Sequence, residues 1–245
     1  MNKKIILALS LLGILTFQNC KDGKDPEPEP ITAPLITLPT AIKNVDGILM
    51  AISTFTKANS VDLIVGSAHA VFFKNKNPLI KVETSNLKIN TKLCTRSHDT
   101  LYFYSASASE PKGIEYKSQI LWQSTATPDV PAINDNDGSG MPNIPVVPEF
   151  LNMSVSQDKA INWVSSYGGD SIIFIVKGPL ATYKRTFNNT ISSHTIPLAE
   201  IAKIGKGAAS IQIINYKLIT KTVGTKTYAF LKQVIGNCTK VTITP

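Results

Sequence analysis

The sequence is poor in charged residues and in the side chains on which many recognition sites depend. Charged residues make up 17% of the 245 residues, and there are only two arginines, three cysteines and three histidines. No uncharged apolar run reaches the roughly 18 residues that a membrane-spanning helix needs. Arginine forks commonly read phosphates and bases, so their scarcity argues against nucleic acid as a partner. Polytopic membrane proteins and nucleic-acid-binding proteins are therefore disfavoured.

Familiar catalytic signatures are missing as well. The chain has no P-loop, no H-E-x-x-H or C-x-x-C pair and no G-x-S-x-G elbow. Residues 94–99 hold a cysteine, a histidine and an aspartate, but neighbours around a turn point apart and catalytic triads are assembled from distant segments. We therefore expect a protein that is not an enzyme. The alternative is a secreted hydrolase whose site is assembled from loops around His69 or His98.

β-Branched residues are abundant, with 29 Ile, 14 Val and 23 Thr, and they favour pleated, half-buried surfaces. Short apolar or alternating runs, separated by Gly, Pro, Asn and Asp, predict strands. These runs cover residues 48–52, 61–65, 70–73, 79–82, 101–104 and 114–122, and then 159–164, 171–176, 183–187, 191–196, 210–220, 226–234 and 240–244. The pattern predicts an all-β fold built from two antiparallel β-sandwich domains.

Changes in composition predict the domain boundaries. The second half, with about seven strands and one short helix at 198–204 between Pro197 and Gly205, resembles an immunoglobulin-like sandwich. Trp122 and Trp163 are expected to fill the two cores. The predicted parts are a signal peptide (1–19), a Pro/acidic tether (20–40), an N-terminal β-sandwich (41–128), a linker (129–148) and a C-terminal immunoglobulin-like sandwich (149–245).

The amino terminus has the pattern of an exported protein. A basic start (1–4) precedes a 13-residue uncharged stretch (5–17), and Cys20 follows. This arrangement resembles a bacterial lipoprotein signal, in which the cysteine is lipidated by the signal peptidase II route. Proline alternates with acidic residues after Cys20, which predicts an extended tether and resembles the signals of surface-exported lipoproteins. The resemblance implies an anchor in the bacterial outer membrane, at the cell surface or facing the periplasm. An ordinary cleaved signal with an incidental cysteine is the alternative.

A run of oxygen-bearing residues predicts a weak calcium loop. When the loop is counted from Asp135 as position 1, positions 1, 3, 5 and 9 carry side-chain oxygens and position 6 is Gly140. The short calcium loops of extracellular bacterial proteins have this spacing. Val146 occupies position 12, where a bidentate glutamate is usual. A solvated turn in a linker is the alternative. The four candidate ligands are Asp135, Asp137, Ser139 and Asn143.

Two cysteines remain after Cys20, and an exported protein lies in an oxidising compartment. Cys94 and Cys238 are therefore candidates for a disulfide. The alternative is that each thiol is a small buried hydrophobe in its own domain.

Basic charge is concentrated in the second half. Residues 31–140 carry 10 basic and 9 acidic side chains, whereas residues 141–245 carry 11 and 4. Such an excess indicates either a basic face for an anionic polymer or lysines that protect sheet edges and maintain solubility, and we favour the second.

The function expected from these features is that of a lipid-anchored binding or adhesion module. Its ligand would be a carbohydrate, an envelope polymer or a partner protein, and its only metal would be Ca²⁺. Tyr102 and Tyr104 alternate onto one face of a predicted strand, which would support sugar binding if that face were outside. A purely structural envelope protein is a further alternative.

Overall fold

Two long neighbouring strands, β15 (Gly207–Val223) and β16 (Lys226–Thr244), form the middle of the fold. A two-residue turn joins them. Gly224 adopts a φ of 60° there, the left-handed conformation that the first position of a tight hairpin turn requires. Both strands are rich in β-branched residues, which suits them to long pleated segments.

The structure, a computed structural model, describes residues 39, 42–58, 61–145, 147–163 and 168–245. Residues 42–245 form one compact unit. The predicted signal peptide, the lipidation site Cys20 and all of the predicted tether except Pro39 lie outside the described residues.

β15 and β16 belong to a ten-stranded sheet with the order β13-β12-β15-β16-β1-β2-β7-β6, in which β10 is added beside β16 and β3 beside β2. Its neighbouring strands are antiparallel, except that β1 and β10 run parallel to β16. The remaining strands of this sheet are β1 (Gly47–Ala58), β2 (Val61–Lys74), β3 (Asn77–Val82), β6 (Thr95–Arg96), β7 (Leu101–Tyr104), β10 (Phe150–Ser154), β12 (Ser171–Lys177) and β13 (Thr182–Asn188).

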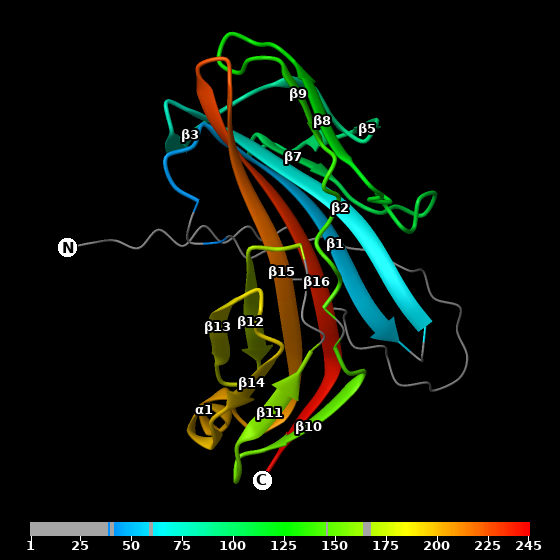
Figure 1. The fold of residues 1–245 in the computed structure, drawn as a ribbon, viewed down its shortest axis with the longest axis vertical. Coiled ribbons are helices and arrows are strands. Elements are labelled where there is room, and N and C mark those ends of the chain that lie inside the picture. Colours follow the sequence, from blue (N-terminus) through cyan, green and yellow to red (C-terminus); the bar gives the residue numbers. More distant parts are fainter. Residues whose placement is uncertain (1–38, 40–41, 59–60, 146, 164–167) are drawn as a thin grey trace, which may run out of the picture. The chain divides into compact units, whose positions relative to one another are not determined.

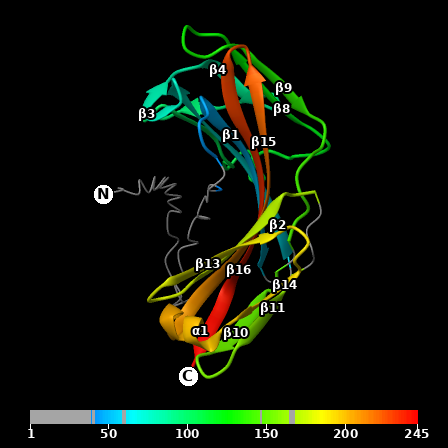
Figure 2. The same cartoon turned by 60° about the vertical axis from the view of Figure 1, so that its left-hand side comes forward.

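Smaller elements lie at the two ends of the large sheet (Figures 1 and 2). A four-stranded sheet of order β5-β4-β8-β9 lies near one end, and the pair β11-β14 with helix α1 lies near the other. The helix spans the predicted residues, with Pro197 before it and Gly205 after it. The bounds are β4 (Ser85–Ile89), β5 (Lys92–Leu93), β8 (Ile120–Thr125), β9 (Ile133–Asp137), β11 (Lys159–Asn162), β14 (Ser193–Ile196) and α1 (Leu198–Ile204).

One face of the large sheet carries two hydrophobic clusters in succession. Tyr228 and Phe230 of β16 belong to the first cluster, and Cys238, further along the same strand, belongs to the second. Trp122 lies in the first cluster and Trp163 in the second, at 2% and 4% exposure, which confirms their predicted core positions. The four-stranded sheet covers the first cluster, and β11, β14 and α1 cover the second.

The predicted all-β class is confirmed, whereas the division into two sandwich domains is not. The ten-stranded sheet contains strands from both predicted domains, and β16 contributes buried side chains to both hydrophobic clusters. Residues 129–148, expected to be a linker, include strand β9 and then a segment that lies against the large sheet. No helix in the described part of the chain has the length and hydropathy of a membrane-spanning segment.

Two glycines explain why the long strands were predicted as shorter ones. A Cβ on Gly66 of β2 would lie 1.9 Å from the Ile114 carbonyl oxygen, and a Cβ on Gly236 of β16 would lie 2.4 Å from that of Pro145. Each glycine therefore permits another segment to cross the strand in close contact. In the sequence these glycines resemble strand ends, but in the structure the strands continue through them.

Replacing Gly236 by alanine should destabilise the fold, because the added methyl group meets backbone that cannot rotate away. We expect Gly236→Ala to lower the free energy of unfolding by about 1–3 kcal/mol. Gly138→Ala is the matched control, since its Cβ would meet nothing within 4 Å. That control should change the free energy of unfolding by less than about 0.5 kcal/mol. Urea denaturation of both variants measures the difference, and equal stabilities would contradict the proposed close contact.

Candidate functional site

The residues predicted to bind calcium lie at the end of β9, where they contact lysines of the large sheet. Asp137 and Asp135 alternate onto the same side of β9. An Asp137 carboxylate oxygen lies 2.8 Å from the Lys232 ammonium nitrogen, and an Asp135 oxygen lies 2.6 Å from that of Lys221. Lys232 also donates to the Ser139 hydroxyl and to the Gly140 carbonyl, each at 2.6 Å.

The cation that satisfies this loop is therefore an ammonium group of the chain itself. The Lys232 side chain is 4% exposed, and its three N–H groups have three oxygen acceptors within 2.8 Å. Asn143 is engaged through its backbone carbonyl, which accepts a hydrogen bond from the Asn215 amide at 3.1 Å. The described residues contain no group of three or more His, Cys, Asp or Glu side chains arranged for a metal.

These contacts argue against calcium at this loop. Calcium at this loop would have to displace Lys221 and Lys232 from the two carboxylates, and displacing Lys232 would leave a buried charge unpaired. The partner of these oxygens, Lys232, lies 93 positions after Ser139 in the sequence, so local spacing could not identify it. The residues do not fit a calcium site.

The same contacts argue against a serine–lysine catalytic pair. Ser139 and Lys232 are within hydrogen-bond distance, as in enzymes where a neutral lysine activates a serine. An activating lysine needs a free lone pair, whereas the Lys232 nitrogen donates to Asp137, Ser139 and Gly140 at once. The cluster therefore holds residues 138–145, here called the crossing segment, against the large sheet (Figure 1).

The predicted disulfide is not formed. Cys94 and Cys238 are both free and buried, and they lie in different hydrophobic clusters. Burial raises the pKa of the Cys94 thiol to about 12 and also raises that of Cys238, so both behave as small hydrophobes.

The three histidines do not assemble a hydrolytic centre among the described residues. His69 is buried in β2, and burial lowers its pKa to about 4. His98 is exposed on a turn, whereas Cys94 is buried. The His194 ring nitrogen lies 2.7 Å from the Tyr183 hydroxyl, and burial with the nearby Arg185 lowers the pKa of this histidine. No hydrogen bond or ion pair in the described ranges joins a histidine to a carboxylate or a thiol.

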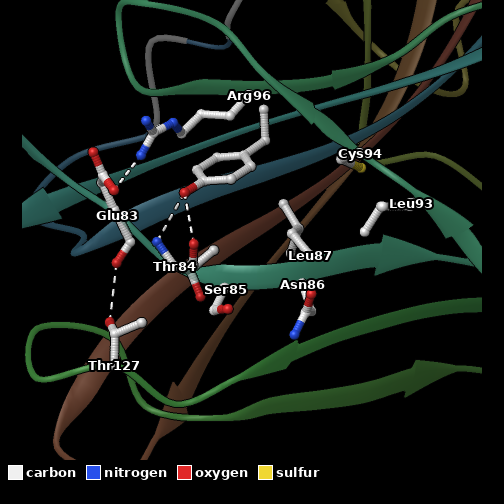
Figure 3. A pocket seen from close by; sticks show the side chains of 10 residues that line it. Glu83, Thr84, Ser85, Asn86, Leu87, Leu93, Cys94, Arg96 and Thr127 are labelled. Atoms are coloured by element: carbon white, nitrogen blue, oxygen red, sulfur yellow. Dashed lines mark hydrogen bonds and ion pairs between the residues drawn. The ribbon is translucent and has the colours of Figure 1, made fainter.

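A pocket of about 470 Å³ opens at the rim of the first cluster, between the four-stranded sheet and the large sheet (Figure 3). Apolar side chains and hydroxyl, amide and charged groups together form its lining. We call it the β4 pocket. Its lining residues are Glu83, Thr84, Ser85, Asn86, Leu87, Leu93, Cys94, Arg96, Tyr102 and Thr127.

Tyr102 fixes the start of β4 beside this pocket. Its hydroxyl accepts a hydrogen bond from the Thr84 backbone N–H at 2.9 Å and donates one to the Thr84 carbonyl at 2.8 Å. Because Tyr102 is 4% exposed, it does not form the outward aromatic face that would have supported sugar binding. Its ring packs in the first cluster, and Tyr104 packs beside it.

The rim of the pocket combines a bulge, an ion pair and a bridging hydroxyl. The register of β4 shifts between Ser85 and Lys88, and Asn86 within the shift has a left-handed φ of 52°. Such bulges redirect side chains beside functional sites. Arg96 forms an ion pair with Glu83, and Figure 3 shows these two facing each other. The Thr127 hydroxyl donates to the Glu83 carbonyl at 3.0 Å.

Sequence reasoning did not find this pocket. Its polar residues come from segments around 83–86, 96 and 127, which contain no shared motif. The one available signal was the scarcity of arginine, since Arg96 is one of only two in the chain.

Known protein families, curated proteins and solved structures were compared with the chain, and none matches it.

The Asp137–Lys232 contact should make stability depend on acid. Burial alone would raise the Asp137 pKa, but hydrogen bonds from Lys232 and Ser139 outweigh it and lower the pKa from 3.8 to about 2. A lowered pKa stabilises the folded state above pH 4, and this contribution is lost as pH falls through 2. We expect a loss of about 2 kcal/mol from this group. The free energy of unfolding of Asp137→Asn, measured by urea denaturation at each pH, should lack this loss between pH 4 and pH 2.

The control for this measurement is Asp99→Asn, which changes a carboxylate exposed on a turn. Its unfolding free energy between pH 2 and pH 5 should follow that of the unmodified chain. If Asp137→Asn followed the unmodified chain equally closely, the ion pair would not have the stabilising role derived above.

Proposed function

We propose that this chain is a lipid-anchored protein of the bacterial cell envelope that binds a carbohydrate-like ligand in the β4 pocket without transforming it. The pocket is the observation that carries the proposal. Hydroxyl and amide groups and one ion pair line it beside apolar side chains, a composition suited to orienting polar small molecules.

The charges at the rim favour a neutral ligand. Glu83 and Arg96 neutralise each other, so the pair offers a carboxylate acceptor and a guanidinium donor without net charge. Ser85, Asn86 and Thr127 add groups that both donate and accept. A molecule rich in hydroxyl groups supplies donors and acceptors to all of them. Leu93, which is 57% exposed, offers apolar surface for a ring face.

The location rests on the amino terminus. The apolar stretch that ends shortly before Cys20 and the Pro/acidic residues after it support lipidation at this cysteine and an extended tether. Each acyl chain contributes about 0.8 kcal/mol per buried CH₂ group, so several chains would anchor the protein without a spanning helix. At the cell envelope, such a ligand would be an envelope polysaccharide or the glycan of a partner protein.

Binding at the pocket can be tested with a glycan array, followed by titration of the best glycan. We expect Asn86→Gly and Arg96→Ala each to weaken binding about tenfold, the loss of one or two hydrogen bonds. Glycine at position 86 keeps the left-handed backbone while it removes the amide. Arg185→Ala is the matched control, because it removes the other arginine, at β13 far along the sheet. Equal binding by all variants would place the ligand elsewhere.

Anchoring is tested separately by Cys20→Ser. Without the sulfur no acyl chain can be attached, so the protein should move from the membrane fraction to the soluble fraction on cell fractionation. Asn19→Ser, which keeps Cys20, should leave the protein in the membrane fraction. A Cys20→Ser protein that stays with the membrane would disprove this anchor.

A further inference from the structure

Within the described residues, one edge of the large sheet ends in an apolar stretch of β2 that has a strand partner on one side only. Residues 61–65 pair with β1 on one side, from Val61 opposite Ala58 to Val65 opposite Thr54. On the other side, the described partners of β2 begin at Gly66, which bonds to residues 112 and 114, and β7 follows from residue 68. We call residues 61–65 the β2 edge.

Backbone geometry shows which groups this edge presents. The Gly66 N–H donates to the Lys112 carbonyl, and the Gly66 carbonyl accepts from the Ile114 N–H, so both Gly66 groups point away from β1. The direction of backbone groups repeats every second residue along a strand. The N–H and carbonyl groups of Asp62 and Ile64 therefore also point outward. Such a row is a template for another strand.

The side chains of the β2 edge do little to block such pairing. Val61 is 65% exposed, Leu63 50% and Ile64 45%. Folded proteins usually protect an open edge with lysine, proline or inward charges. Here the only charge is Asp62, which lies 4.0 Å from Lys57 of β1.

We propose that a second copy of this chain pairs with the β2 edge, antiparallel and about a twofold axis at Leu63. A twofold axis requires the edge to pair with itself, and one register meets every constraint. Centring the pair on Ile64 would use Gly66, whose groups are already bonded, and centring it on Asp62 would oppose two like charges. Centring it on Leu63 places Asp62 opposite Ile64 of the second copy.

This register also joins the apolar side chains. Leu63 faces its own counterpart in a pair without direct hydrogen bonds, where Cβ atoms lie about 5 Å apart. Val61 lies opposite Val65, on the same face as Leu63. The four outward groups of one copy meet those of the other. The contact is small compared with the roughly 1,200–2,000 Å² of stable interfaces, so we expect a weak dimer that depends on concentration.

Disulfide trapping tests the register directly. The full chain with Cys20→Ser is used in all variants, and the buried Cys94 and Cys238 are kept. Leu63→Cys should form a covalent dimer under mild oxidation at least about tenfold faster than Leu79→Cys. Leu79 is the control, since it is 72% exposed on β3 and away from the edge. Equal rates for the two would overturn the proposal, and so would faster trapping of Asp62→Cys than of Leu63→Cys.

A pair of charge variants at residue 64 tests the same register a second way. In the Leu63→Cys background, Ile64→Lys places an ammonium opposite Asp62 of the second copy and should keep or increase trapping. Ile64→Glu places a carboxylate there and should reduce trapping at least about fivefold. Far-UV circular dichroism confirms that both fold. Equal yields of the covalent dimer from the two variants would overturn the register. If both variants fold and neither forms the covalent dimer, the edge binds a different partner or none.

Discussion

The buried ammonium group of Lys232 is the constraint on which much of this fold depends. It lies on the core face of β16, after Phe230 of the first hydrophobic cluster and before Cys238 of the second. An ammonium group in that position needs acceptors, because an unpaired buried charge costs several kcal/mol. The end of β9 and the crossing segment supply them through Asp137, Ser139 and Gly140. The chain therefore passes from one cluster to the other while packed against the sheet.

Several features of the fold follow from local chemistry and were predictable. Proline before and glycine after an apolar run determine helix α1, and the β-branched composition determines the all-β class. The two tryptophans identify the two cores. The joining of those cores into one unit was not predictable, because Gly66 and Gly236 resemble strand ends until the crossing backbone beside them is seen. When each long strand is taken as two short ones, the sequence predicts two separate sandwiches.

The candidate site was harder to predict than the fold. Local spacing identified the oxygens of Asp135 and Asp137, but it carried no information on Lys221 and Lys232, which reach them from distant strands. The β4 pocket is similar, since its rim combines a bulge at Asn86 with residues from two other segments, Arg96 and Thr127. Its geometry depends on how the four-stranded sheet meets the large sheet. A single sequence carries no information on how these two sheets pack against each other.

The long strands also change the meaning of the charge asymmetry. Three lysines of the basic second half pair with aspartates of the first: Lys221 with Asp135, Lys226 with Asp46 and Lys232 with Asp137. Asp46 is 3% exposed, so that carboxylate is also neutralised inside the fold. The excess of positive charge in residues 141–245 arises partly because a division at residue 140 separates internal partners. These lysines hold the unit together, which removes them from any basic face offered to an anionic polymer.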